Sequence, residues 1–248
     1  LVGSEMCIRD SIKSMGLDDL KPFNPREKVI EYLLEDAEKK QKLIDLTVKE
    51  FADETSRESP APGGGTISAY MGALGAALGT MVANLSSHKA GWDARWEEFS
   101  NWANKGQAIQ SELMVLVDED TEAFNRIMSA FGLPKESAEE KTARSMAIQE
   151  ATLFATEVPL HTMQASYKVF ELCQAMAEEG NPNSVSDAGV GVLAARAAVL
   201  GAGLNVKINA SGLKDKQKAE QLVSEANILI NKANEAEKEI MKIVEAKL

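Results

Sequence analysis

Asp120 is the first residue whose surroundings in the sequence could support chemistry. It is the one charged member of a helical stripe that is otherwise apolar, formed by Leu113, Val117, Phe124, Ile127 and Phe131. A carboxylate on a buried helix face needs hydrogen-bond donors, a cation or a wet cavity. Two interpretations stay open: a structural carboxylate held by helix N–H groups or an arginine, and an acid–base group with a shifted pKa.

Asp187 is the second candidate, in the segment "GNPNSVSDAG". An acid in the first turn of a helix commonly compensates the helix dipole, and by itself this favours a structural role. Its neighbours are dense in neutral hydrogen-bonding groups, which suit a polar heterocycle or an amide. They are Asn181, Asn183, Ser184 and Ser186.

The third feature is the loop "SPAPGGGT", which contains Pro62, Gly63, Gly64, Gly65 and Thr66. Adjacent glycines indicate unusual backbone dihedrals or a close approach of the backbone to another group. Thr66 is predicted to cap the following helix, whose free N–H groups would seat an anion or an electron-rich oxygen. The loop lacks the lysine and spacing of a phosphate-binding loop, and no strand pattern precedes it, so neither nucleotide fingerprint applies.

Composition excludes several classes of function. The chain has 248 residues and a net charge of -11, which argues against nucleic acid or an anionic membrane surface as the main partner. Two cysteines and two histidines are too few to indicate a metal site or a disulfide framework, and a reducing cytosol is expected. A core of one large domain or two small ones is possible.

The elements that must position these residues are helices throughout. The segment after the glycines has a small stripe (Ala69, Ala73, Ala76, Thr80, Ala83) and a large one (Ile67, Met71, Leu74, Leu78, Met81, Leu85). Residues 188–204 repeat the small stripe, so the two helices are predicted to pack closely as central, surrounded elements. Arg196 inside the second helix is expected to pair with a buried carboxylate, with Asp120 as one option.

Further helices extend the all-α prediction, among them one that ends just before the prolines of the loop. One ends at Gly132, one covers about 138–178 with a kink or break at Pro159, and the C-terminal one is amphipathic and suited to bundle or dimer packing. The uncharged run 67–85 is close to a membrane span in length, but its small residues favour a buried core helix. Residues 1–11 match nothing that follows and are predicted to be a non-native tail.

The motifs together resemble a known family. The segments "SPAPGGGTISAYMGALGAALGTMVANLSSHKAGWD", "VDEDTEAFNRIMSAFGLPK", "ATEVPLHTM" and "GNPNSVSDAGVGVLAARAAVLGAGLNVKIN" resemble the formimidoyltetrahydrofolate cyclodeaminase family, which includes methenyltetrahydrofolate cyclohydrolases. Thr66 stands where the family commonly has serine. Residues 12–28 resemble the junction to a formimidoyltransferase domain, and residues 29–248 resemble the cyclodeaminase-like helical domain.

The resemblance implies a dimeric, all-α, cytoplasmic enzyme that holds a folate near the glycine loop. It would close 5-formimidoyltetrahydrofolate to 5,10-methenyltetrahydrofolate with release of ammonia, without a metal or a resident cofactor. Asp187 and Asp120 would divide proton transfer and pterin orientation, with Asp187 favoured as the proton carrier. Pro62, Gly63, Gly64, Gly65, Thr66, Asn181, Asn183 and Ser186 would bind the substrate.

Partners implied by the resemblance are a folate, with or without a polyglutamate tail, a second copy of the chain and a fused or associated glutamate formimidoyltransferase. Two alternatives stay open. One is a cyclohydrolase, in which water opens methenyltetrahydrofolate at the same carbon. The other, from a different class, is a helical dimerisation module without catalysis, in which all the acids are structural.

Overall fold

The computed structural model describes residues 15–16, 42–59 and 61–248. The chain divides into two compact units, 1–45 and 46–248. Within the described residues every regular element is helical, which confirms the all-α prediction. The α-helices are α4 (Val48–Thr55), α5 (Gly64–Ser87), α6 (Trp96–Phe131), α7 (Ala138–Glu179), α8 (Val185–Ser211) and α9 (Lys216–Glu245). The short 3-10 helices are η1 (Leu43–Asp45), η2 (Asp93–Arg95) and η3 (Pro182–Ser184). The predicted tail 1–11 and most of the junction 12–28 lie outside the described residues.

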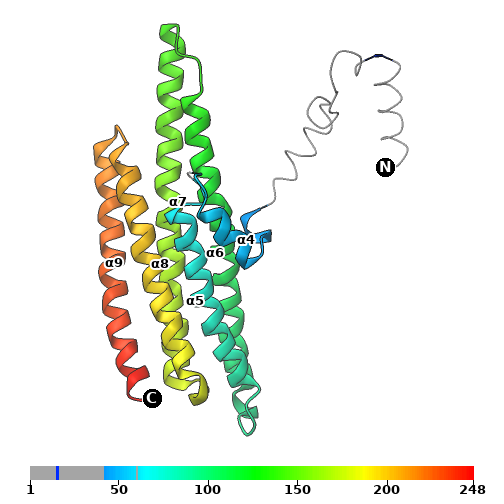
Figure 1. Cartoon of the computed structure of the whole chain (residues 1–248). Helices are drawn as coiled ribbons and strands as arrows, with labels where there is room; N and C mark the ends of the chain where they lie inside the picture. Colours follow the sequence, from blue (N-terminus) through cyan, green and yellow to red (C-terminus); the bar gives the residue numbers. More distant parts are fainter. Residues whose placement is uncertain (1–14, 17–41, 60) are drawn as a thin grey trace. The chain divides into compact units, whose positions relative to one another are not determined.

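The second unit is a bundle of long helices that run side by side (Figure 1). Helix α5 packs against α6, α7 and α8, while α9 packs on α8 and α7. The ends of the helices follow local capping rules. Ser137 and Glu140 form a capping box at the start of α7, and the Asp215 side chain accepts from Lys218 N at the start of α9.

Pro159 neither divides nor ends α7, which runs unbroken from Ala138 to Glu179. Proline has no N–H, so the carbonyl of Ala155, four residues earlier, loses its helical partner. Asn209 on α8 replaces that partner, because its side-chain Nδ2 donates to the Ala155 oxygen at 2.6 Å. The tertiary contact therefore lets one long helix contain the proline.

The small stripes of α5 and α8 face each other, as the sequence predicted. A Cβ added to Gly75 would lie 2.8 Å from the Gly191 carbonyl oxygen, and one added to Gly191 would lie 3.1 Å from the Gly75 oxygen. The two backbones are thus in direct contact, and the helices are antiparallel. Gly64 lies beside Asn205 at one end, and Asn181 N donates to Ser86 Oγ at the other.

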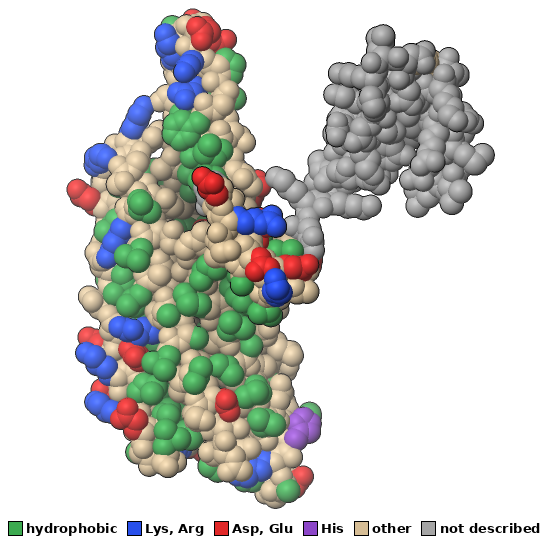
Figure 2. Space-filling view, viewed as in Figure 1, with side chains coloured by type: hydrophobic (Ala, Val, Ile, Leu, Met, Phe, Trp, Pro, Cys, Tyr) green, Lys and Arg blue, Asp and Glu red, His purple; other side chains and the backbone are tan. Residues whose placement is uncertain are grey.

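The large stripe of α5 points away from the bundle. Leu74, Met81 and Leu85 are 46%, 38% and 46% exposed. Helix α8 also exposes large apolar side chains, and Figure 2 shows apolar side chains gathered over these helices; on α8 they are Val190, Leu193, Leu204 and Ile208. The prediction that both helices are surrounded is therefore wrong for one face of each.

Two helical segments, Gly64–Ser87 and Pro182–Ser211, are long and apolar enough to cross a membrane by that criterion alone. In the most apolar 18-residue stretch of each segment, 61% of the first and 50% of the second is buried within this chain. Core helices of water-soluble proteins meet the same criterion, so composition does not decide what covers the exposed half.

Replacing Gly75 with alanine tests the backbone contact between α5 and α8. In an unobstructed helix this change stabilises by up to about 1 kcal/mol. Here the new methyl group would meet a backbone carbonyl that cannot rotate away, so we expect a loss of about 1–3 kcal/mol in the free energy of unfolding, measured by urea denaturation. Gly64→Ala is the control, because its Cβ would make an ordinary 3.4 Å contact with Asn205. Equal effects of the two changes would contradict the close packing.

Candidate active site

The structure brings Asp120 of α6 onto the first turn of α5. Thr66 Oγ1 donates to Asp120 Oδ2 at 2.8 Å, and Thr121 Oγ1 lies 3.4 Å from the same hydroxyl. The position follows from the stripe on α6, because Leu113 and Val117 are buried and the stripe reaches the edge of the core at Asp120. Asp120 itself is half-buried. The glycine loop and the first candidate carboxylate therefore share one site.

Thr66 does not cap α5, contrary to the prediction from the sequence. The helix begins at Gly64 with Gly63 as its N-cap, and Gly63 has no side chain to cap it. Its first backbone hydrogen bond runs from Ile67 N to the Gly63 oxygen at 3.0 Å. Thr66 is buried one turn inside, where its hydroxyl reaches across to α6. A cap was predicted because threonine is favoured at N-caps, but the tertiary acceptor uses the hydroxyl instead.

Gly65 is required by close approach and not by an unusual dihedral. A Cβ at this position would lie 2.1 Å from Asp120 Oδ1, closer than any non-bonded contact allows. Its φ lies outside the left-handed region. The absence of a side chain lets the carboxylate lie directly against the helix backbone, so Gly65 and Asp120 form one unit.

Two opposing effects set the protonation of Asp120. Burial is the larger one and raises the pKa of this carboxyl above its usual value. The Thr66 hydroxyl and backbone N–H lower the pKa, since both stabilise the ionised form. Together they favour a carboxyl that can exchange a proton more easily at mild pH than an exposed aspartate can.

The carboxylate also changes what the helix N-terminus can bind. The free N–H groups of the glycine loop were predicted to seat an anion or an electron-rich oxygen. Asp120 supplies that negative charge itself, so a second anion at the same point would be repelled. The arrangement instead suits a cation or an N–H group that can approach the carboxylate.

Three polar residues near the loop were missed by the reading of the sequence. They are Thr121, Ser68, whose hydroxyl donates to the Gly64 oxygen at 2.7 Å, and Asn205, whose side chain lies beside Gly64. Asn205 carried a detectable signal, since it interrupts the apolar segment "LGAGLNV". Ser68 and Thr121 carried none, because helices contain many such residues.

Pro62 is buried at the start of this loop and is preceded by a cis peptide bond to Ala61. It lies two residues before α5 begins and is part of the same segment as Gly63, Gly64 and Gly65. The predicted substrate-binding residues 62–66 therefore remain together in the structure.

Asp187 lies at the opposite end of α5 within the same chain. Because α5 and α8 are antiparallel, the first turn of α8 is level with Met81, fifteen residues beyond Thr66 or about 22 Å along the helix. Asp187 is half-buried and has no hydrogen bond or ion pair to any described residue. The sequence had suggested that Asp120 and Asp187 lie in one cleft. Within a single chain the structure does not bring them together.

The polar residues predicted around Asp187 stay with it. Asn181 Oδ1 accepts from Asn183 N at 3.2 Å, so this side chain organises the turn η3. The side chains of Asn183 and Ser186 are exposed and remain available for a ligand. Ser184 occupies the N-cap position of α8, but its side chain makes no capping hydrogen bond.

Arg196 does not pair with Asp120, which was the option considered from the sequence. Its Nε lies 2.7 Å from Glu237 Oε2 and donates to Asn234 Oδ1 at 2.9 Å, both on α9. The arginine faces α9 because α5 occupies the opposite side of α8. Among the described residues, the partners that the structure shows for Asp120 are therefore hydrogen-bond donors and not a cationic side chain.

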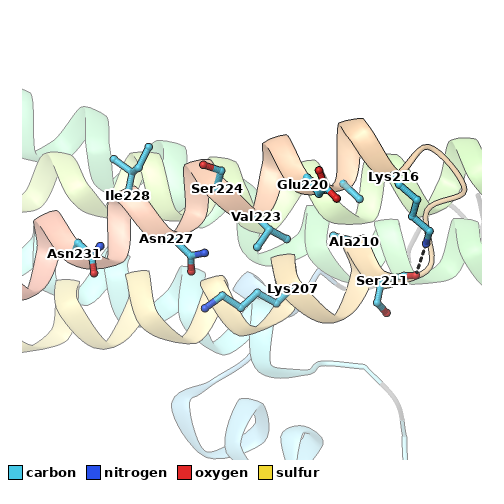
Figure 3. A pocket seen from close by; sticks show the side chains of 11 residues that line it. Lys207, Ala210, Ser211, Lys216, Glu220, Val223, Ser224, Asn227, Ile228 and Asn231 are labelled. Carbon is cyan, nitrogen blue, oxygen red and sulfur yellow. Dashed lines mark hydrogen bonds between the residues drawn. The ribbon is translucent and has the colours of Figure 1, made fainter.

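A groove of about 560 Å³ lies between α8 and α9 (Figure 3). Lys207 and Lys216 come from its two walls, and Lys216 Nζ donates to the carbonyls of Ser211 and Leu213. Asn227 and Asn231 add side-chain amides on α9. None of the predicted site residues lines this groove.

The chain is similar in sequence and in fold to several known proteins. A family model for formiminotransferase-cyclodeaminase matches residues 47–228. A methenyltetrahydrofolate cyclohydrolase of Methylorubrum extorquens is 39% identical over 202 residues, covering 82% of this chain and 97% of that protein. The formimidoyltransferase-cyclodeaminase of Rattus norvegicus is 35% identical over 88% of this chain, which spans only 41% of that protein. A crystal structure of formiminotetrahydrofolate cyclodeaminase from Thermotoga maritima has a TM-score of 0.73 and 25% identity, covering 83% of this chain and 98% of that one.

The stability of an Asp120→Asn variant separates the two interpretations of this carboxylate. Burial raises the pKa of Asp120 in the folded chain, so ionised Asp120 destabilises the fold increasingly as pH rises through that raised value. We therefore expect the variant to gain stability relative to the wild type as pH rises from about 4, the ordinary pKa of an aspartate, to the raised pKa of Asp120, measured by urea denaturation. If the variant instead loses stability relative to the wild type as pH rises, the carboxylate is a structural helix partner.

Proposed function

The chain belongs to the formiminotransferase-cyclodeaminase family, and from this premise we propose that it closes 5-formimidoyltetrahydrofolate to 5,10-methenyltetrahydrofolate and releases ammonia. The observation that carries the proposal is Asp120, a half-buried carboxyl with a raised pKa that lies against bare helix backbone. The substrate's formimidoyl group is an amidine, which is cationic when protonated. A carboxylate at this position attracts that cation and stabilises its positive charge.

The reaction transfers one proton, forms one carbon–nitrogen bond and breaks another. N10 of the folate attacks the carbon of the protonated amidine, which forms the new carbon–nitrogen bond and a tetrahedral centre. The N10 proton passes to the Asp120 carboxylate, which then delivers it to the departing nitrogen. Cleavage of that carbon–nitrogen bond releases ammonia and leaves the positive charge on the methenyl product. Atoms and charge balance without an external reactant.

Asp120 is assigned the proton transfer, although the resemblance favoured Asp187. The reason is electrostatic, because burial and hydrogen bonds at Asp120 set a balance between its two protonation states. The Thr66 hydroxyl holds the carboxylate in one orientation. Residues 62–66 would contact the substrate from the main chain, with Asn205 as a further polar contact beside Gly64.

Further parts of the proposal concern partners and setting. The substrate is a reduced folate, with or without a polyglutamate tail, and the chemistry requires no metal and no resident cofactor. We also propose a cytoplasmic homodimer. The relatives in Rattus norvegicus and Mus musculus are named as formimidoyltransferase-cyclodeaminases, which supports a fused or associated formimidoyltransferase as a partner.

One observation favours a second candidate activity. The Methylorubrum extorquens protein, which this chain covers over 97% of its length, is named a methenyltetrahydrofolate cyclohydrolase. In that reaction water attacks the methenyl carbon and the same carboxylate would remove a proton from the water. Ammonia release from 5-formimidoyltetrahydrofolate, compared with loss of methenyltetrahydrofolate absorbance, distinguishes the two.

An Asp120→Asn change is expected to lower kcat for the preferred substrate by about 10²–10⁴-fold, because an amide cannot carry the proton. Both substrates should be assayed with the purified full chain. The wild-type kcat/KM should fall as pH decreases through the raised pKa of Asp120, whereas the variant should lose that dependence.

Glu122→Gln is the matched control for this change. Glu122 is on the same helix, exposed, and paired with Arg126 at 3.2 Å, so removal of its charge should leave kcat within a factor of about two. An Asp120→Asn enzyme as active as this control would remove Asp120 from the mechanism.

Gly64→Val tests the glycine loop. Space exists for a Cβ here, since the nearest atom is Asn205 Nδ2 at 3.4 Å, so the chain should fold. The branched side chain would cover the backbone that faces the substrate. We expect a folate KM raised about tenfold or more, corresponding to about 1.4 kcal/mol, with an unchanged circular dichroism spectrum. Unaltered kinetics would mean that the loop only begins the helix.

A further inference from the structure

Asn205 of α8 is a second polar side chain that lies against the first turn of α5. A Cβ added to Gly64 would lie 3.4 Å from Asn205 Nδ2 and 3.8 Å from Asn205 Oδ1. Outside the turn itself, no other atom of the described residues comes within 4 Å of that point. The space beside Gly64 is therefore open, whereas Asp120 fills the space beside Gly65. A group that approaches the backbone at Gly64 contacts the Asn205 amide.

A hydrogen bond within α8 fixes the orientation of this amide. Asn205 Nδ2 donates to the Gly201 carbonyl oxygen at 3.0 Å. The flipped amide would place two oxygens at that distance without a proton between them, so the nitrogen is the atom that faces the carbonyl. Asn205 Oδ1 accepts from no residue in the described part of the chain. This half-buried oxygen is therefore available to a donor on a ligand.

Two oxygen acceptors thus flank one turn of α5. Asp120 approaches Gly65 from α6, and Asn205 approaches Gly64 from α8. Consecutive Cα atoms are about 3.8 Å apart and consecutive helical side chains point about 100° apart, so the two acceptors face neighbouring sides of the turn. They differ in chemistry. The Asp120 carboxyl becomes a donor when it gains a proton, whereas the Asn205 oxygen accepts at every pH.

A formimidoyl group offers donors to both acceptors. The terminal nitrogen of its protonated amidine carries two N–H bonds, and it still carries N–H bonds in the tetrahedral centre and when it leaves as ammonia. Hydrogen bonds from a positively charged nitrogen are roughly twice as strong as neutral ones. Methenyltetrahydrofolate has no N–H group at the corresponding carbon, and the water that attacks it is a neutral donor. An acceptor beside Gly64 therefore distinguishes the two substrates.

We infer that Asn205 Oδ1 binds the departing nitrogen of the formimidoyl group, and that this contact favours ammonia release over hydrolysis of methenyltetrahydrofolate. The role assigned to Asn205 rests on the proposed function for the identity of the substrate. Asp120 moves the proton, and Asn205 holds the nitrogen that receives it. The hydrogen bond strengthens as that nitrogen gains positive charge, so it stabilises the protonated tetrahedral centre from which ammonia leaves.

Two changes at this position separate recognition from a structural role. Asn205→Leu removes the oxygen, so we expect kcat/KM for ammonia release to fall about 10–100-fold and kcat/KM for methenyltetrahydrofolate hydrolysis to fall less than about tenfold. Asn205→Asp keeps an oxygen and adds negative charge beside a cation, so it should retain more ammonia release than the leucine variant. Neither leucine nor an ionised aspartate can donate to the Gly201 carbonyl. Equal losses of both activities in both variants would mean that Asn205 only holds α8, and would overturn the inference.

Asn227→Leu is the matched control for the loss of an amide. Asn227 is exposed on α9, in the groove of Figure 3, and has no hydrogen bond to a described residue. The same replacement there should leave both kcat/KM values within a factor of about two, because no charge or buried contact is lost. A control as impaired as Asn205→Leu would count against a specific role for Asn205.

A binding measurement tests the contact without any turnover. 5-Formimidoyltetrahydrofolate and 5-formyltetrahydrofolate differ at one terminal group, which is a nitrogen donor in the first and an oxygen acceptor in the second. In the Asp120→Asn chain, we expect calorimetry to show about tenfold or tighter binding of the formimidoyl compound. The preference should vanish when Asn205→Leu is added.

The two measurements fail in different ways. Equal affinities for the two compounds in the Asp120→Asn chain, or a preference that survives Asn205→Leu, would overturn the role of Asn205. A wild-type chain that releases no ammonia, while its Asp120→Asn variant keeps an Asn205-dependent preference for the formimidoyl compound, would overturn the proposed reaction and leave the contact in place.

Discussion

The direct contact of two helix backbones at Gly75 and Gly191 is the constraint on which the rest of this protein depends. A Cβ at either residue would crowd the carbonyl oxygen of the other, so α5 and α8 lie closer than helices with branched side chains can. Close packing on one side decides what happens on the other, since a helix with small residues inward must place its large residues outward. The exposed apolar face is therefore a consequence of how the core is built.

The same contact sets the antiparallel register, and the register decides which functional groups meet. Gly64 lies beside Asn205, and Ser86 accepts from Asn181 at the far end. The loop before α5 and the turn before α8 are consequently held at opposite ends of α5. The two segments look alike in sequence, since each is a polar loop followed by a helix of small residues. The packing that joins their helices keeps the two loops apart within one chain.

At Asp120, one missing side chain decides how closely a carboxylate approaches a helix backbone. Gly65 allows a carboxylate to lie against a helix N-terminus, where the helix dipole and the Thr66 hydroxyl stabilise its charge while burial opposes it. A carboxyl fully exposed to water would stay ionised, and one fully buried without donors would stay protonated. The balance between these effects is what a proton carrier requires. The family to which the chain belongs acts in folate one-carbon metabolism.

The sequence by itself determined the helical class, the two helices with small stripes, the end of α6 at Gly132, and Asp120 as an unusual carboxylate, because all of these depend on local periodicity and composition. Only the tertiary structure decided that Pro159 lies inside a continuous helix, since Asn209 reaches Ala155 from another helix. It also decided that Thr66 binds Asp120 instead of capping α5, and that Arg196 pairs with Glu237. Each of these outcomes depends on a partner distant in sequence. Local pattern specifies which groups need a partner, and packing alone specifies which partner they find.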